Sequence, residues 1–150
     1  MVLPLLTRID HVGIACRDLA KSIELYRATF GLEVVSLESN EEQGVREAML
    51  AVSRDNPLPD AGFGGYVQLL EPLGPDTPVG KFLARRGEGI HHIGYGVTNI
   101  TEAMAAISGT GVRLIDQRPR HGSMGASIAF LHPADLGGVL TELVQSASSA

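Results

Sequence analysis

The chain has 150 residues, of which 44% are hydrophobic and 19% are charged, a balance that suits one globular domain with a sizeable core. The formal net charge of −5 argues against a nucleic-acid partner, because phosphate contacts need clustered lysine and arginine. Cys16 is the only cysteine, which excludes an intrachain disulfide and favours a reducing compartment. With no apolar run near the ~18 residues of a membrane span and no basic, apolar leader, we expect a cytoplasmic protein without a membrane partner.

The first half of the chain predicts one helix and four strands. A strand begins at His11, and Asp18 is placed to cap a helix over Leu19–Thr29 that ends at Gly31. Three strands follow, over Glu33–Leu37, Val45–Val52 and Tyr66–Leu70. A loop with prolines and glycines, Ser53–Gly64, separates the last two.

A linker over about 73–88 contains a short predicted helix, Pro78–Arg86, with Thr77 as its cap. The second half then repeats the order of the first. A strand begins at His92, Asn99 caps a helix over Ile100–Gly109, and three strands follow, over Arg113–Asp116, Ser127–Leu131 and Val139–Val144.

The two halves also align residue by residue. At an offset of 81, Asp10–Leu19 matches His91–Ile100, so that His11 lies over His92. The last strands align at an offset of 74, because the first half carries the extra loop. The chain therefore predicts two β-α-β-β-β modules, at about 8–72 and 89–145, within a single α+β domain over 1–150.

Four polar side chains occupy repeat-related positions in otherwise apolar strands. His11 corresponds to His92, and Gln68 corresponds to Glu142. Burial without partners would cost each of them roughly 2–7 kcal/mol, and a shared metal ion would remove that cost. Taken singly, each has an ordinary explanation, because such histidines often cap strands or pack in cores and strand residues alternate between core and solvent.

Several stretches of the sequence resemble the vicinal oxygen chelate superfamily and, within it, the methylmalonyl-CoA epimerase family, over nearly the whole chain. The most specific are the Gly-Glu-Gly-Ile-His-His run ending at His92 and the Leu-Leu-Glu-Pro-Leu run after Gln68. Other matching stretches are Ile9–Ala15, Glu42–Arg46, Phe130–Pro133 and Gly137–Leu140. The resemblance implies a cupped, mixed, eight-stranded sheet around one metal ion, with His11, Gln68, His92 and Glu142 as its ligands.

The resemblance further implies a metal-dependent epimerase that interconverts the (R) and (S) forms of methylmalonyl-CoA, or of a close 2-carboxyacyl-CoA. The divalent ion is left open among Co, Mn, Mg, Ni and Zn. Such an ion, with two nitrogen and two oxygen ligands, would stabilise the enolate formed when the hydrogen alpha to the thioester is removed. The family also favours a homodimer.

Glu47 is the candidate for the base that removes this hydrogen. It shares a strand face with Val45 and Met49, which look like core residues, whereas its repeat equivalent is Ile128. A carboxylate with little water around it has a raised pKa and is a better base near neutral pH. The alternative is a solvent-facing glutamate on an edge strand. Glu142, or a water that it holds, is the candidate for the second acid or base.

Two further assignments complete the interpretation. Lys81, Arg85 and Arg86 could contact CoA phosphates, although a solvated helix face would look the same. His91 would point away from the ligand face, so we expect it to have a structural role or to support a ligand from outside the metal site. Two other functions stay open at this point: a glyoxalase-type isomerase acting on a glutathione hemithioacetal, and a metal-free small-molecule-binding protein of the same fold.

Overall fold

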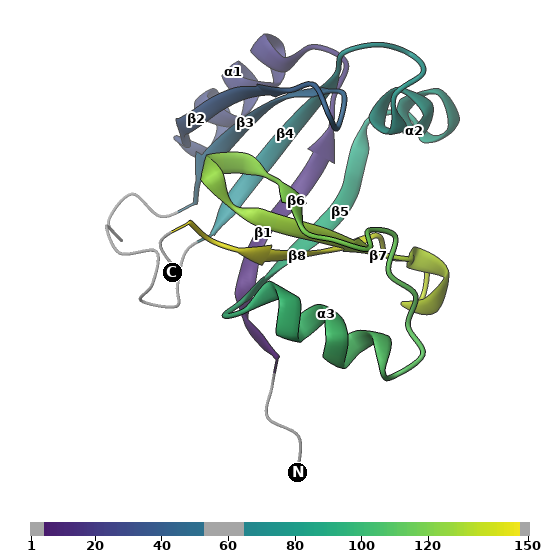
Figure 1. Ribbon diagram of the computed structural model, residues 1–150. Coiled ribbons are helices and arrows are strands. Elements are labelled where there is room, and N and C mark those ends of the chain that lie inside the picture. The colour runs from purple at the N-terminus through teal and green to yellow at the C-terminus, as the bar shows by residue number, and fades with distance from the viewer. Residues whose placement is uncertain (1–4, 53–64, 148–150) are drawn as a thin grey trace. The chain divides into compact units, whose positions relative to one another are not determined.

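The computed structural model describes residues 5–52 and 65–147, which excludes the predicted loop Ser53–Gly64. Eight strands and three α-helices lie in this described part (Figure 1). None of these helices has the length and hydropathy needed to span a bilayer. In chain order the elements are β1 (Leu6–Ala15), α1 (Leu19–Phe30), β2 (Glu33–Asn40), β3 (Val45–Ala51), β4 (Tyr66–Pro72), α2 (Pro78–Arg86), β5 (Gly89–Val97), α3 (Ile100–Ser108), β6 (Arg120–His121), β7 (Ser127–Leu131) and β8 (Thr141–Gln145).

The strands form a mixed sheet with the order β2-β3-β4-β1-β5-β8-β7-β6. Strand β1 runs parallel to β4, and β5 runs parallel to β8. The outer pairs of each half are antiparallel. This arrangement confirms the predicted α+β fold with an eight-stranded mixed sheet, whereas the cup around a metal ion stays a prediction.

The described residues divide into two compact units. One takes the residues up to Asp10 and those from His92 onward, and the other takes the described residues of His11–His91. Because β1 and β5 each contribute residues to both units, these units do not coincide with the two repeat modules. The assignment of the whole chain to one domain stays a prediction.

The His11–His91 unit has its core between α1 and strands β3 and β4. Leu19 of α1 is buried with Leu50 and Leu69, which have no exposed surface. The predicted caps are confirmed: the Asp18 side chain accepts a hydrogen bond from the Lys21 amide, and Gly31 ends the helix with φ of +72°. On α2, Val79 and Leu83 pack with residues of β1, β3 and β4.

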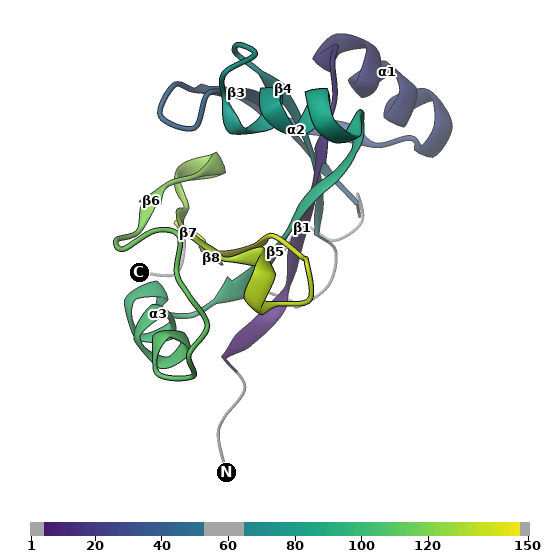
Figure 2. The same ribbon diagram turned by 90° about the vertical axis from the view of Figure 1, so that its right-hand side faces the viewer.

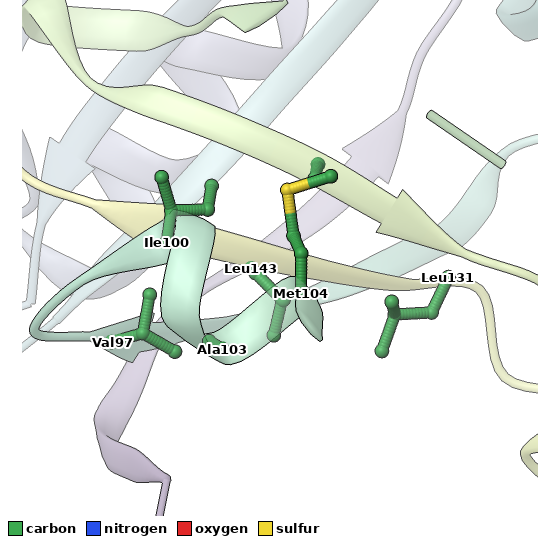
Figure 3. Packing of buried hydrophobic residues seen from close by; sticks show 7 residues of the cluster. Val97, Ile100, Ala103, Met104, Leu131 and Leu143 are labelled. Atoms are coloured by element: carbon green, nitrogen blue, oxygen red, sulfur yellow. The ribbon is translucent and has the colours of Figure 1, made fainter. Parts of the chain in front are cut away.

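The other unit repeats this plan with α3 on strands β7 and β8 (Figure 2). Figure 3 shows Ile100, Ala103 and Met104 of α3 beside Leu143 of β8. The Asn99 side chain caps α3 by accepting from the Glu102 amide, as predicted. Each unit therefore buries the apolar side of one helix on an antiparallel strand pair.

The predicted strand over Arg113–Asp116 is wrong. This segment forms only an isolated bridge, between Leu114 and Leu131, and the outermost strand is instead β6. The Ile115 amide donates to the Phe130 carbonyl, but the Phe130 amide donates to Oδ2 of Asp116 rather than to a backbone carbonyl. The side chain thus replaces one backbone hydrogen bond of a regular ladder, which is the local competition expected of aspartate.

The predicted starts of two strands also need correction. Strand β1 begins at Leu6 and β5 at Gly89, several residues before His11 and His92. The histidines therefore lie inside their strands rather than at the ends.

Candidate metal centre and active site

Parallel strand pairing gives the two predicted ligand pairs the same register. Gly13 of β1 is paired with Gln68 of β4, and Gly94 of β5 is paired with Glu142 of β8. His11 and His92 each stand two residues before that glycine, so each histidine shares a strand face with its glycine. The repeat alignment of Gln68 with Glu142 is thereby confirmed in the backbone.

All four predicted ligands are buried. The exposed fractions are 4% for His11, Gln68 and Glu142, and 3% for His92. Within one unit, Nε2 of His92 lies 3.9 Å from Oε2 of Glu142. His11, His92 and Glu142 are residue types that could hold a metal ion. With the amide oxygen of Gln68 they offer two nitrogen and two oxygen donors, a set that fits a divalent ion.

Glu47 is buried and does not face solvent. Its residue is 4% exposed, and Nε2 of Gln68 donates a hydrogen bond of 3.0 Å to its Oε2. Since the amide nitrogen of Gln68 points to Glu47, the amide oxygen is the end that could bind a cation. The Glu47–Gln68 bond therefore orients both side chains.

The register also confirms which residue corresponds to Glu47. In β3 and β4 Glu47 is paired with Leu70, and in β7 and β8 Ile128 is paired with Val144. Leu70 and Val144 each stand two residues after the predicted ligand of their strand. A buried carboxylate in one half thus replaces a buried isoleucine, 2% exposed, in the other.

His91 and His92 have different surroundings. The His91 ring lies edge-on to the Phe82 ring of α2, with 5.0 Å between their centroids. Burial lowers the pKa of His91 to about 4, so that this imidazole is neutral at neutral pH. The structural role that we predicted for His91 accords with this packing.

Lys81, Arg85 and Arg86 lie exposed on α2. The guanidinium carbon of Arg86 is 5.9 Å from the centroid of the Phe82 ring, a cation–π distance. Their contact with CoA phosphates stays a prediction.

Phe130 is a residue near the site that sequence reasoning missed. Its ring stands edge-on to the His92 ring, with centroids 5.4 Å apart, and its backbone is paired with Glu142. The signal was present in the repeat, because Phe130 corresponds to Met49, the residue paired with Gln68. The two residues thus occupy the same position beside two of the predicted ligands.

Comparison with known proteins identifies the superfamily of the chain. Residues 10–130 match the model of the Glyoxalase/Bleomycin resistance protein/Dioxygenase superfamily. The chain belongs to this superfamily. The match spans most of both repeat modules, from within β1 to within β7, and ends before β8 and Glu142.

Among related proteins of the superfamily, a Streptomyces coelicolor methylmalonyl-CoA epimerase in complex with 2-nitronate-propionyl-CoA is 55% identical, over 95% of this chain and 99% of that one, with a TM-score of 0.88. A methylmalonyl-CoA epimerase in complex with methylmalonyl-CoA and NH4+ is 56% identical, over 96% of this chain and 97% of that one, with a TM-score of 0.89. The ethylmalonyl-CoA/methylmalonyl-CoA epimerase of Cereibacter sphaeroides is 35% identical over 140 residues, 92% of this chain and 97% of that protein.

Proposed function

We propose that this chain is a methylmalonyl-CoA epimerase, an isomerase that interconverts the (R) and (S) forms of its acyl-CoA substrate. The observation that carries the proposal is the 56% identity, over 96% of the chain, to an epimerase whose structure contains methylmalonyl-CoA. The buried Glu47 supports the proposal, because burying a carboxylate costs free energy that packing does not recover. Such unfavourable residues are expected at functional sites.

We further propose that His11, Gln68, His92 and Glu142 hold one divalent metal ion. The equal register of the two pairs and the burial of all four side chains support this set. When bound, such an ion would supply Lewis-acid stabilisation for negative charge on the substrate oxygens. The identity of the metal among Co, Mn, Mg, Ni and Zn stays open in this proposal.

In the proposed mechanism, Glu47 takes the hydrogen alpha to the thioester as a proton. The electron pair of the broken C–H bond moves into the thioester carbonyl, which becomes an enolate. The hydrogen bond from Gln68 to Oε2 keeps the Glu47 carboxylate in one orientation for this step. A second group then returns a proton to the opposite side of the carbon, and we assign Glu142, or a water that it holds, to this role.

Three further proposals concern the CoA contacts, the oligomeric state and the cellular location. Lys81, Arg85 and Arg86 are exposed cationic groups of the kind that binds phosphates, and we assign them to the CoA tail. A homodimer and a cytoplasmic location stay predictions from the family and from the single cysteine.

The direct test is incubation of the protein with (R)- and (S)-methylmalonyl-CoA in separate reactions, each with and without a chelator. We expect each form to give a mixture of both, and we expect the chelator to abolish the reaction. Methylglyoxal with glutathione serves as the competing substrate. Turnover of the hemithioacetal together with inert methylmalonyl-CoA would contradict the proposal and favour a glyoxalase-type isomerase.

A further inference from the structure

The two halves of the chain differ in the residue that is paired with the predicted ligand of the last strand, and in the second half this residue contacts His92. Phe130 occupies the position beside Glu142, whereas its counterpart Met49 occupies the position beside Gln68. The Phe130 and His92 rings are nearly perpendicular, at 83°, with centroids 5.4 Å apart. Perpendicular aromatic pairs at this distance attract one another and favour one relative orientation.

The backbone of Phe130 is held on its outer side by two consecutive residues. Its carbonyl accepts from the Ile115 amide at 2.8 Å, and its amide donates to Oδ2 of Asp116 at 2.8 Å. With both polar groups turned outward, Phe130 and Glu142 form a non-hydrogen-bonded pair, the kind in which opposite side chains come closest. The Asp116 carboxylate thus fixes the strand at the residue whose ring touches His92.

Asp116 is itself held in place. Its carboxylate is 3.2 Å from Nη1 of Arg120, and its side chain is only 10% exposed. The corresponding position in the first half needs no such side chain, because β2 pairs there with β3 through its backbone and Ser36 lies opposite Met49. The second half therefore uses an aspartate side chain at a position where the first half keeps its strand pairing, next to a register shift between Val34 and Ser36.

We propose that Phe130, anchored by Asp116, is a positioning residue that holds the His92 ring in its metal-binding orientation. This inference rests on the proposed metal site. An imidazole free to rotate about its Cβ–Cγ bond would spread Nε2 over several positions, whereas a ring packed edge-on keeps it near Glu142. Phe130 and Asp116 would thus fix the orientation of the His92 ring before the ion binds.

The test measures Co²⁺ affinity by calorimetric titration of the full chain and of matched variants. Phe130→Met, which introduces the residue used in the first half, should raise the Kd for Co²⁺ about two- to tenfold, the range that corresponds to the strength of an aromatic pair. Phe130→Tyr keeps the ring and should keep the wild-type Kd. Ile128→Val serves as the control, because it removes a methyl group from the buried cluster on which Phe130 packs while leaving the Phe130 ring in place.

A second pair of variants tests the anchor. Asp116→Ala should weaken Co²⁺ binding to a similar extent, whereas Asp116→Asn retains a side-chain oxygen for the Phe130 amide and should bind normally. Both variants lose the carboxylate charge beside Arg120, so a difference between them reports the hydrogen bond and not the ion pair. The visible spectrum of bound Co²⁺ should change in Phe130→Met and Asp116→Ala but not in Ile128→Val, because only the first two alter the His92 nitrogen.

Three outcomes would overturn the inference. Equal Co²⁺ affinities and spectra for wild type, Phe130→Met and Asp116→Ala would remove the positioning role while leaving the metal site intact. Weaker binding by Ile128→Val, in proportion to its lower melting temperature, would reduce the effect to general stability. A wild-type chain that binds neither Co²⁺ nor Mn²⁺ would overturn the metal site of the proposed function together with this inference.

Discussion

The β3–β4 pair and the β7–β8 pair have the same backbone register but carry different side chains at one buried position. Gln68 of β4 corresponds to Glu142 of β8, and the next residues, Leu69 and Leu143, also correspond. The residues paired with those two leucines are Ala48 and Ala129, and both are fully buried. The two pairs differ at Glu47, where the other half has Ile128. The comparison teaches that the repeated scaffold supplies the positions of the proposed ligands, whereas the proposed base, Glu47, is a departure from the repeat.

The largest expected effect concerns that departure. Glu47→Gln should keep the fold and the metal content but lower kcat for epimerisation by about 10²–10⁴-fold, the usual contribution of a positioned acid or base. The KM should change little, because the amide has nearly the same shape as the carboxylate. Steady-state rates with each enantiomer check this, and Glu102→Gln on α3 is the matched control. A near-wild-type rate would remove Glu47 from the mechanism.

A second prediction tests whether the two halves contribute alike to stability. Leu69→Ala and Leu143→Ala remove corresponding leucines, 0% and 1% exposed, from the two cores. Each should lower the free energy of unfolding by about 2–5 kcal/mol, the range for a leucine truncated inside a core. Urea unfolding measures the loss, with Leu25→Ala as an exposed control. A large loss for one variant and almost none for the other would mean that the halves are not equivalent in packing.

A third prediction concerns the one difference between the corresponding ligands. Glu142→Gln gives both halves an amide and removes a negative charge from the proposed site. Affinity for Co²⁺ should fall by at least the ~10–100-fold that follows loss of a supporting partner of a ligand. Calorimetric titration measures the change. An unaltered affinity would exclude Glu142 from the ligand set, while leaving its role as a second acid or base to be tested by exchange.

The smallest effect is expected where the second half departs from regular strand structure. Hydrogen bonds from Arg113 hold the pKa of Asp135 at about 2, below its usual value of 3.8. The stability that this carboxylate contributes is therefore present above pH 3.8 and is lost as the pH falls through about 2. Asp135→Asn should melt slightly below wild type near pH 5, and the difference should shrink between pH 4 and pH 2. A difference that grows in acid would contradict this linkage.

The sequence predicted most of the fold because its signals were local or repeated. The helix ends depend on single residues. Asp18 and Asn99 cap helices through their side chains, and Gly31 ends a helix through its positive φ. The correspondence of Gln68 with Glu142 could be read from the repeat alone. The prediction of a strand over Arg113–Asp116 was wrong because the Asp116 side chain, and not a backbone carbonyl, accepts the hydrogen bond from the Phe130 amide. Residue preferences alone do not reveal this substitution.

The candidate site could be predicted only in part, for a related reason. Four polar residues in apolar strands are visible in a sequence, and so is the replacement of Ile128 by Glu47. Neither the hydrogen bond from Gln68 to Glu47 nor the contact between Phe130 and His92 is visible there, since both depend on which strands are neighbours. Phe130 in particular reads as an ordinary apolar residue until the register places it beside Glu142.

The measurement that tests the central claim most directly is elemental analysis of the purified wild type, His92→Ala and His91→Ala after dialysis. If the repeat-related side chains hold the ion, the wild type should carry about one divalent metal per chain. His92→Ala should lose it, while His91→Ala should keep it, because the His91 ring packs on Phe82. Metal retained by His92→Ala and lost from His91→Ala would contradict the account.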